Sequence, residues 1–219
     1  MFTGIIENLG TIERIIPQGE GKILHIGCGL DLTHTRIGDS IAVNGACLTA
    51  VSLGKHAFSV DMAPETVART TFKTAVPGMR VNIERAMQLT SRIDGHLVSG
   101  HIDGTGTISR MEKKSNAILW TIRVAPRLAE EMIEKGSVAV DGISLTINQC
   151  TDTEFSVSII PHTAKHTTIG IKQTGDRVNI ETDMIGKYVR KFLTRNADAG
   201  TGTDRTGVTM ALLARNGFL

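Results

Sequence analysis

The chain has 219 residues, of which 41% are hydrophobic and 4% aromatic, with a formal net charge of +2 and a mean hydropathy of +0.02. This composition excludes a disordered chain, and the length allows one large domain or two small ones with hydrophobic cores. The 24 lysines and arginines form no cluster and aromatic residues are few, which argues against a surface that binds nucleic acid.

The start of the chain and its cysteines indicate a compartment. Residues 1–4 lack the basic and then apolar layout of a signal peptide, and no apolar run reaches the roughly 18 residues that a membrane helix needs. Cys28, Cys47 and Cys150 are widely spaced and form no CxxC pair. We therefore expect a cytoplasmic protein without disulfides and without a membrane contact.

In chain order, the first half predicts short strands over residues 10–15, 22–28, 40–43, 47–52, 57–62 and 80–85, and a short helix over 64–71. β-branched residues interrupted by glycines are typical of such strands. Six short strands in so few residues suggest a small closed barrel, which leaves no unpaired sheet edge.

The second half repeats the first at an offset of 97 residues. SIAVNGACLT at 40–49 lies over SVAVDGISLT at 137–146, and 20 of the 48 positions between 40 and 87 are identical in the two copies. A period of this length indicates a duplicated domain rather than a solenoid. We expect an all-β fold of two homologous six-stranded antiparallel barrels, Greek-key-like, over residues 1–97 and 98–195. The second copy adds a helix over 126–135.

The end of the chain follows a different pattern. Apolar residues recur at helical spacing, and cations fill the opposite face, which predicts an amphipathic helix over 184–195. The apolar positions are Ile185, Tyr188, Val189, Phe192 and Leu193. Such a stripe needs a barrel or another subunit as its partner. Residues 196–206 are a predicted linker and 209–215 a further turn or two, and we assign no role to 196–219.

Several motifs are ambiguous by themselves. Asn44-Gly45 and Asp141-Gly142 favour turns with positive φ, and neither Cys47 nor Ser144 lies in a GxSxG context. His96 and His101 have no third ligand at metal-binding spacing, so we expect no metal site and interpret His96 as structural.

Six motifs taken together resemble the riboflavin synthase family: MFTGI at the start, NGxCLT, GHLVSGH, DGISLT, IPxT and RVNIE. The resemblance covers residues 1–195 and leaves the tail outside it. It implies two barrels and a C-terminal helix that joins three identical chains. It also implies an active site between the first barrel of one subunit and the second barrel of its neighbour.

The resemblance further implies a reaction without metal or redox cofactor. Two molecules of 6,7-dimethyl-8-ribityllumazine give riboflavin and 5-amino-6-ribitylaminouracil, because one substrate transfers a four-carbon unit to the other. The family pattern carried onto this sequence places one substrate pocket in each barrel. The first-barrel pocket is expected to comprise Gly4, Ile5, Ile6, Cys47, Leu48, Thr49, Asp61, Met62, Ala63, Pro64, Glu65 and Thr66. The second is expected to comprise Gly100, His101, Ile102, Lys135, Ser144, Leu145, Thr146, Ser158, Ile159, Ile160, Pro161, His162 and Thr163.

The two copies must differ where the chemistry is directed, because one substrate donates carbons and the other accepts them. The differing pairs are Ile5/His101, Gly38/Lys135, Asn44/Asp141, Cys47/Ser144 and Glu65/His162. The resemblance assigns the chemistry to Ser40, Cys47, His101 and Asp141. In this interpretation His101 takes a proton from a ring methyl, Cys47 or a held water adds to the partner ring, and Asp141 orients or relays.

Two other classes of protein compete with this interpretation. A non-catalytic lumazine- or flavin-binding protein would use similar barrels, but it would not need two pockets with different polar side chains. A barrel of the flavin-reductase kind would need a nicotinamide domain, and the sequence has no strand–GxGxxG–helix unit.

Overall fold

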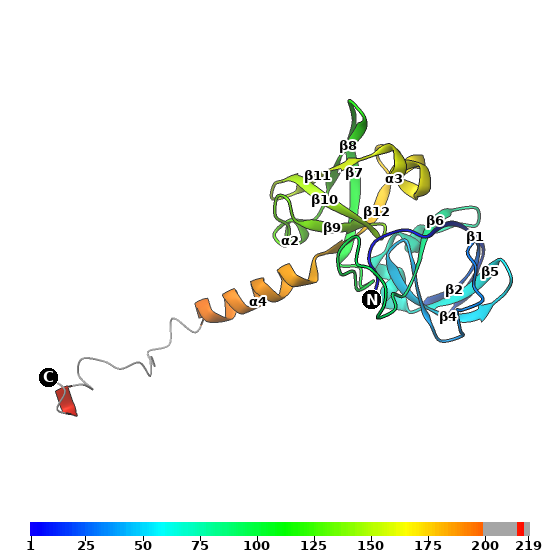
Figure 1. The fold of residues 1–219 in the computed structure, drawn as a ribbon, viewed down its shortest axis with the longest axis horizontal. Helices are drawn as coiled ribbons and strands as arrows, with labels where there is room; N and C mark the ends of the chain where they lie inside the picture. Colours follow the sequence, from blue (N-terminus) through cyan, green and yellow to red (C-terminus); the bar gives the residue numbers. More distant parts are fainter. Residues whose placement is uncertain (199–213, 217–219) are drawn as a thin grey trace. The chain divides into compact units, whose positions relative to one another are not determined.

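The first part of the chain forms a closed six-stranded barrel (Figure 1). The computed structural model describes residues 1–198 and 214–216. The strands are β1 (Asn8–Gln18), β2 (Gly21–Gly27), β3 (Ser40–Val43), β4 (Ala46–Leu53), β5 (Ala57–Met62) and β6 (Arg80–Arg85). They pair antiparallel around the barrel in the order β1-β2-β5-β4-β3-β6.

A second closed barrel repeats this topology. Its strands are β7 (Gly104–Lys114), β8 (Ala117–Arg123), β9 (Ser137–Val140), β10 (Ile143–Cys150), β11 (Glu154–Ile159) and β12 (Arg177–Thr182). Their order is β10-β11-β8-β7-β12-β9. Because the barrel is closed, this ring can be read backward from β7, and it is then the order of the first barrel with each strand replaced by its copy. The predicted all-β fold of two six-stranded antiparallel barrels is confirmed.

Strand irregularities recur at equivalent places in both barrels. The register shifts at Glu13 in β1 and at Ser109 in β7, and again at Val51 in β4 and at Asn148 in β10. A bulge bends its strand and increases the local twist. The four bulges therefore allow sheets of only six strands to close on themselves.

Each barrel has its own hydrophobic core. The first is centred on Ile12, Leu24, Ile26, Phe58 and Ile83, all of them fully or almost fully buried. The second is centred on Ile108, Trp120, Ile122, Phe155 and Ile180. In β1, β2 and β7 the core positions alternate with less buried residues, as expected for a sheet with one buried face, whereas β6 and β12 are buried on both faces.

Short helices cover one end of each barrel. α1 (Pro64–Arg69) is followed by the 3-10 helix η1 (Thr71–Thr74), and α3 (Pro161–His166) by η2 (Thr168–Ile171). Proline at the first helical position starts both α1 and α3, since its missing N–H is not needed there.

The predicted helix over 126–135 is too long. α2 (Pro126–Ala129) is a single turn, after which the chain turns back toward β9. Met132 is buried in the second core, and Lys135 has a left-handed φ of +64°. A left-handed residue cannot continue a right-handed helix, so burial of Met132 and the turn at Lys135 override the sequence pattern.

The C-terminal helix α4 (Met184–Asp198) follows β12 and confirms the predicted helix. It continues to Asp198, so residues 196–198 are helical and not part of a linker as predicted. The rest of the predicted linker and residues 209–213 lie outside the described residues, whereas Ala214 and Arg215 are helical. No helix of the described chain is long and apolar enough to cross a membrane.

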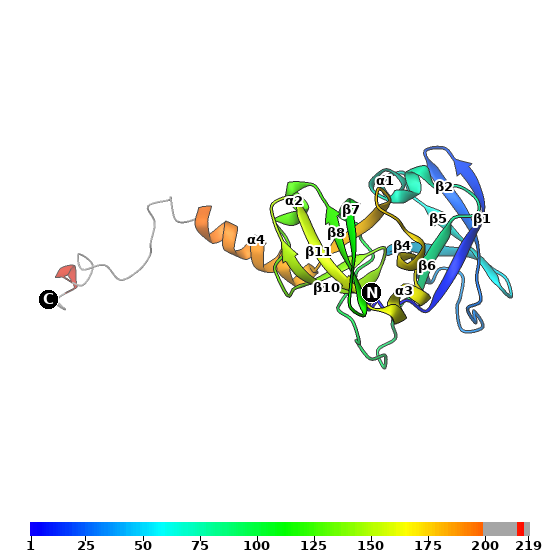
Figure 2. The same cartoon turned by 90° about the horizontal axis from the view of Figure 1, so that it is seen from above.

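The N-terminus lies where the two barrels meet, in both views (Figures 1 and 2). Phe2 and Val98 exchange both backbone hydrogen bonds, with N–O distances of 2.7 and 3.0 Å. Their side chains pack with Ala42 and Ala139 in a small buried cluster. The segments that precede the two barrels thus pair with each other.

Candidate functional site

Two hairpin turns pack back to back at the junction of the barrels. Asn44 and Gly45 join β3 to β4, Asp141 and Gly142 join β9 to β10, and all four residues have positive φ. A Cβ atom on Gly45 would lie 2.6 Å from the Gly142 nitrogen, and one on Gly142 would lie 2.7 Å from the Gly45 nitrogen. Only glycine allows this approach. The turns fix Cys47 and Ser144 at equivalent positions, three residues beyond Asn44 and Asp141.

The segments that precede the barrels are exchanged between them. The backbone N–H of Cys47 donates to the carbonyl of Gly100, and that of Ser144 donates to the carbonyl of Gly4, both at 2.8 Å. Ile102 belongs to the first core and Ile6 packs against the second.

The structure groups these segments differently from the expected pockets. Gly4 and Ile6 contact the second barrel, although Ile5 also lines a cavity of the first, and Gly100, His101 and Ile102 lie against the first. The family pattern, as carried onto this sequence, assigns each segment to the barrel that it directly precedes.

Two buried glutamates hold the exchanged segments. Glu84 accepts from the Thr3 N–H (2.6 Å), the Thr3 hydroxyl (2.7 Å) and the Gly4 N–H (3.0 Å). Glu181 accepts from the Ser99 N–H (2.6 Å), the Ser99 hydroxyl (2.7 Å) and the Gly100 N–H (2.9 Å). Burial raises the pKa of both carboxyls, and this effect is larger than the opposite effect of the hydrogen bonds, which lower it. The repeated RVNIE motif contained this signal, but its glutamate was interpreted only as part of a strand.

A cavity of about 200 Å³ opens beside Cys47 in the first barrel. Its wall includes Cys47, Glu65, Thr66, Gly100 and His101. Cys47 is half-buried and His101 is exposed. A wider cleft of about 550 Å³ lies on the same barrel and is lined by Thr49 and residues 61–64. The residues expected in this pocket are thus divided between two cavities of the first barrel, with Cys47, Glu65 and Thr66 at the smaller one and Thr49 and residues 61–64 at the wider one.

Four of the expected pocket residues have their side chains in the barrel cores. Leu48, Met62 and Ile159 are exposed by 3% or less and Ile102 by 9%, so they act mainly as packing residues. Ser40 lines a different cavity of about 650 Å³, shared with Ile5 and Arg85. The structure therefore separates Ser40 from the cavity of Cys47.

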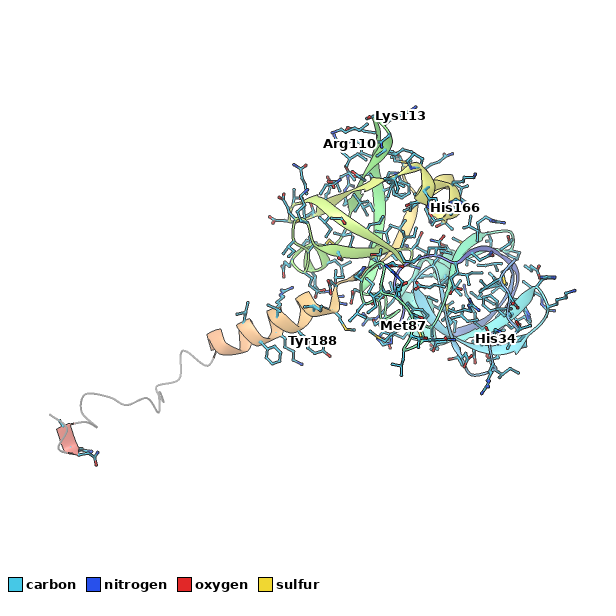
Figure 3. The ribbon with its side chains drawn as sticks, viewed as in Figure 1. His34, Met87, Arg110, Lys113, His166 and Tyr188 are labelled. Atoms are coloured by element: carbon cyan, nitrogen blue, oxygen red, sulfur yellow. The ribbon has the colours of Figure 1, made fainter. Side chains whose placement is uncertain are left out.

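The second barrel presents a cleft of about 500 Å³ at the hairpin of β7 and β8. Ile159 and Pro161 line it together with Met111 and Lys113. Lys113 lies near the tip of this hairpin, as Figure 3 shows. The hydroxyls of this barrel that face outward include Thr146 and Ser158, both of them exposed. Of the remaining expected residues, Leu145 packs against the second core, Thr163 is half-buried, and Ile160 and His162 are exposed.

A histidine–serine pair lies beside the segment of residues 4–6. His96 Nδ1 and Ser144 Oγ are 2.7 Å apart, and the His96 N–H donates to the Thr3 carbonyl. Burial lowers the pKa of His96, which favours the neutral imidazole. Its Nε2 atom is buried and has no protein partner within the described residues. Our interpretation of His96 as only structural missed this contact, although GHLVSGH contained the residue.

Lys135 adopts an unusual backbone conformation. Its φ is +64°, and the equivalent residue of the first barrel is Gly38, with φ +95°. A residue with a side chain in this region costs roughly 1–2 kcal/mol, and such strain is concentrated at functional sites. The exposed Lys135 side chain therefore supports the expectation that this residue binds a ligand.

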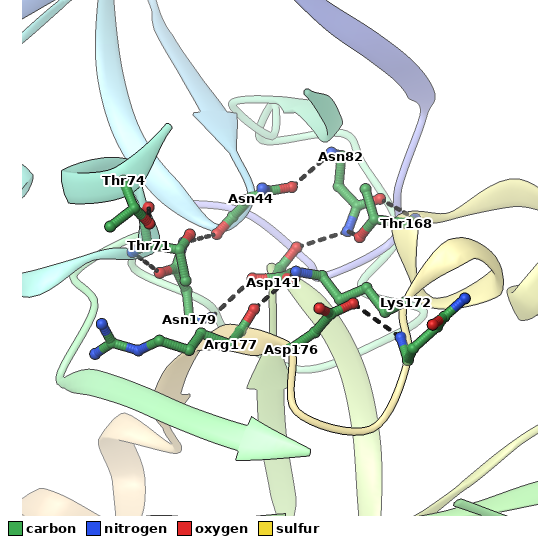
Figure 4. A network of polar contacts seen from close by, with 11 residues as sticks. Asn44, Thr71, Thr74, Asn82, Asp141, Thr168, Lys172, Asp176, Arg177 and Asn179 are labelled. Carbon is green, nitrogen blue, oxygen red and sulfur yellow. Dashed lines mark hydrogen bonds and ion pairs between the residues drawn. The ribbon is translucent and has the colours of Figure 1, made fainter. Parts of the chain in front are cut away.

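Asp141 lies at the junction of the barrels rather than in a pocket with Cys47. Its side chain is fully buried, and its Oδ1 atom accepts the Asn179 N–H at 2.8 Å (Figure 4). Any effect of Asp141 on a bound molecule must therefore pass through neighbouring groups.

No group of three or more metal-ligating side chains occurs among the described residues. The rings of His162 and His166 stack at 4.3 Å, and His166 Nδ1 lies 2.8 Å from the His162 carbonyl oxygen. This pair is a local feature of α3.

Comparison with known proteins gives consistent results. A family model described as the lumazine binding domain matches residues 3–86 and 99–183. The chain is 46% identical to a riboflavin synthase of Bacillus subtilis over 218 residues, with both chains fully covered. It is 42% identical to one of Actinobacillus pleuropneumoniae, again over both full chains. Both alignments include the tail, which we had expected to lie outside the resemblance.

Solved structures share the fold. LumP complexed with 6,7-dimethyl-8-(1'-D-ribityl) lumazine superposes with a TM-score of 0.74 at 23% identity, covering 83% of this chain and 99% of LumP. LumP complexed with riboflavin gives a TM-score of 0.76 at the same identity and coverage. At this identity the likeness supports the architecture alone.

Proposed function

Because the chain belongs to the riboflavin synthase family, we propose that it converts two molecules of 6,7-dimethyl-8-ribityllumazine into riboflavin and 5-amino-6-ribitylaminouracil. The observation that carries the proposal is the duplication. Cys47 and Ser144 occupy equivalent positions in two barrels, and each is bonded through its backbone to the exchanged segment of the other half. Two copies of one site suit two copies of one substrate. Holding both substrates close together gives the coupling step the advantage of an intramolecular reaction.

In this proposal, each barrel binds one ribityllumazine. Residues 47–49, 61–66 and 100–102 bind the first molecule, whereas residues 4–6, 135, 144–146 and 158–163 bind the second. Thr49, Thr66 and their copies Thr146 and Thr163 recognise the ring and the ribityl chain, since a polyol needs many donors and acceptors.

The polar side chains that differ between the pockets direct the chemistry. Cys47, or a water held beside it, adds to the ring of the accepting molecule and is eliminated again before the product leaves, which regenerates the thiol or the water. A ring methyl of a bound molecule gives up a proton. His101 takes or shuttles this proton at the first pocket, and at the second the neutral His96 imidazole can accept it through the Ser144 hydroxyl. Four carbons then pass from one ring to the other without any net oxidation. Ser40 and Asp141 remain candidates that act from outside the Cys47 cavity.

The working unit in this proposal is a homotrimer with the active site between the first barrel of one subunit and the second barrel of its neighbour. Support comes from α4, where Ile185, Tyr188, Val189, Phe192 and Leu193 are each exposed by 52–65%. A continuous apolar stripe of this kind marks an association surface. We divide each subunit into domains over residues 1–97 and 98–195, with α4 as the association element.

A cytoplasmic location belongs to the same proposal. Cys28, Cys47 and Cys150 are free thiols, which suits a reducing compartment.

The direct test is incubation of the purified chain with 6,7-dimethyl-8-ribityllumazine as the only substrate. We expect one riboflavin for every two lumazines consumed, followed by absorbance and by chromatography of both products. We expect the same rate after treatment with a chelator. Tight binding of the lumazine without any riboflavin would instead identify a non-catalytic lumazine-binding protein, and restoration by zinc after chelation would contradict a metal-independent reaction.

A further inference from the structure

A buried ion pair lies at the junction of the two barrels (Figure 4). Lys172 Nζ is 3.2 Å from Asp141 Oδ2, and the same ammonium donates to the Arg177 carbonyl at 2.7 Å. The Asp141 side chain is fully buried, and that of Lys172 is exposed by only 12%. Both charges are therefore largely removed from water.

The network around this pair is nearly two-fold symmetric. The Asn82 N–H donates to Asn44 Oδ1, and the Asn179 N–H donates to Asp141 Oδ1, both at 2.8 Å. The amide of Asn82 donates to the Asp141 carbonyl at 2.9 Å, and the amide of Asn179 donates to the Asn44 carbonyl at 2.8 Å. Each turn is thus held by an asparagine from the other barrel.

The symmetry is broken at two positions together. Asn44 corresponds to Asp141, and 97 residues before Lys172 the first copy has Ala75. One half therefore pairs a carboxylate with an ammonium, whereas the other has a neutral amide and a methyl group. Asn44 Nδ2 is buried without a hydrogen-bond partner among the described residues, and Asp141 Oδ2 has only the ion pair with Lys172. The first half shows that the neutral arrangement is compatible with this fold.

Stability alone is a weak explanation for the charged version. A buried ion pair usually contributes little net stability compared with neutral groups of similar size, because both charges lose their hydration. A fixed pair in a site without water does, however, act strongly on nearby charges. The Asp141 turn leads within three residues to Ser144, and Ser144 contacts His96.

We propose that Lys172 is a positioning residue, which keeps the buried Asp141 side chain charged and thereby makes the pocket of Ser144 electrostatically different from that of Cys47. This inference rests on the proposed function, because the difference serves to distinguish the two bound substrates.

The electrostatics of Asp141 agree with this role. Burial raises its pKa, the ammonium of Lys172 lowers it, and the negative charge of Asp176 raises it further. Asn82 and Asn179, which bond to Asp141 from the two barrels, do not titrate. Removing Lys172 should therefore raise the pKa of Asp141 further, so that the carboxyl takes up a proton at higher pH.

The first arm of the test does not depend on turnover. The carboxyl ¹³C resonance of Asp141, assigned through its disappearance in Asp141→Asn, is titrated in the full chain and in Lys172→Arg and Lys172→Met. We expect an ionised carboxyl at neutral pH in the parent and in Lys172→Arg, and a midpoint moved to higher pH in Lys172→Met. Identical titrations in all three proteins would overturn the proposal.

The second arm measures turnover. Asp141→Asn with Lys172→Ala copies the pair Asn44 and Ala75, so it should fold and keep the melting temperature of the parent. We expect its kcat to fall by about 10–100-fold, as for other residues that act through a neighbour, while the affinity for an unreactive ribityllumazine analogue stays within about threefold. Lys172→Arg should keep most of the activity, and Lys55→Ala, in an exposed turn, serves as the control.

The experiments distinguish a failure of the role of Lys172 from a failure of the proposed function. Full kcat in the neutral double variant would overturn the role of Lys172. A parent chain that makes no riboflavin would instead overturn the proposed function, and the titration would still decide whether Lys172 keeps Asp141 charged.

Discussion

The two barrels agree in their backbone architecture and differ in the side chains around their pockets and at their junction. The strands, the four bulges, the glycine turns and the glutamates at the ends of β6 and β12 are repeated almost residue for residue. The pocket walls pair Cys47 with Ser144 and Glu65 with His162. The two copies thus share a scaffold and differ in the side chains that are able to react.

Exchange of the leading segments makes the two halves dependent on each other. Glu84 in the first barrel bonds Thr3 and Gly4, whose carbonyl then accepts from Ser144 in the second. Glu181 does the same from the second barrel to the first. The cavity beside Cys47 is therefore built from both copies, because Gly100, His101 and Ile102 line it together with residues of the first barrel.

The largest effect is expected where the two pockets differ in reactivity. Cys47→Ser gives the first pocket the side chain of the second, and we expect kcat to fall by about 10²–10⁴, because a positioned nucleophile or acid–base group is lost. His101→Gln should have an effect of the same order. Analogue affinity should stay within about threefold, which single-turnover kinetics and calorimetry on the same variants would measure.

Cys28→Ser is the matched control for Cys47. Cys28 packs against the first core, and burial raises the pKa of its thiol, so it stays protonated. If Cys47→Ser lost rate and melting temperature in parallel, as a packing residue would, the assignment of Cys47 to the reaction would be wrong.

The shared scaffold predicts equal losses of stability in the two halves. Gly45→Ala and Gly142→Ala each combine a positive φ with a contact below 3 Å to the other turn. We expect each to lower the free energy of unfolding by about 3 kcal/mol or more. Gly78→Ala and Gly175→Ala have similar φ values but open space around the new Cβ, so each should cost only about 1–2 kcal/mol. Urea unfolding would measure all four.

A marked inequality between Gly45→Ala and Gly142→Ala would contradict the symmetric packing of the turns. Equal costs for the packed and the open glycines would show that strain alone, and not the approach of the two backbones, makes glycine necessary.

The repeat made most of the scaffold predictable from the sequence. Runs of β-branched residues interrupted by glycines predicted the six strands, and the copy at an offset of 97 residues supplied the second barrel. The helix over 126–135 was overestimated, because its pattern does not reveal that Met132 turns inward and that Lys135 adopts a left-handed conformation.

The pocket was less predictable, because it depends on contacts between distant segments. Nothing local in residues 4–6 or 100–102 indicates that each crosses to the other barrel. The bonds that hold them come from glutamates about 80 residues away along the chain. For the same reason the contact of His96 with Ser144, 48 residues apart, was not foreseen.

Binding should reveal the pockets as separate sites. Thr66→Val and Thr163→Val each remove one hydroxyl from a different pocket, and we expect each to weaken one of the two affinities for a ribityllumazine analogue by about 1–3 kcal/mol. The other affinity should not change. Isothermal titration would resolve the two sites, with the exposed Thr153→Val as control. Loss of both affinities in either variant would mean that the pockets are coupled.

The smallest expected effect is on the pH dependence of the free energy of unfolding. His96, which contacts Ser144 of the second barrel, should contribute to it. Burial lowers the folded pKa of His96 below its ordinary value of about 6.5. Between the folded pKa and about 6.5, the unfolded chain binds more protons than the folded chain. The contribution of His96 to the free energy of unfolding is therefore complete above about pH 6.5 and is lost as the pH falls toward the folded pKa. His96→Gln should cost about 0.5–1.5 kcal/mol above pH 6.5, where its bond to Ser144 is lost. That cost should shrink on acidification, because the parent must then protonate a buried imidazole and the variant need not.

Thermal unfolding of the parent, His96→Gln and the exposed control His56→Gln from pH 5 to 8 would measure this dependence of the cost on pH. Parallel curves for the parent and His96→Gln would show that the imidazole carries no pH dependence, and the neutral His96–Ser144 pair would then lose its support.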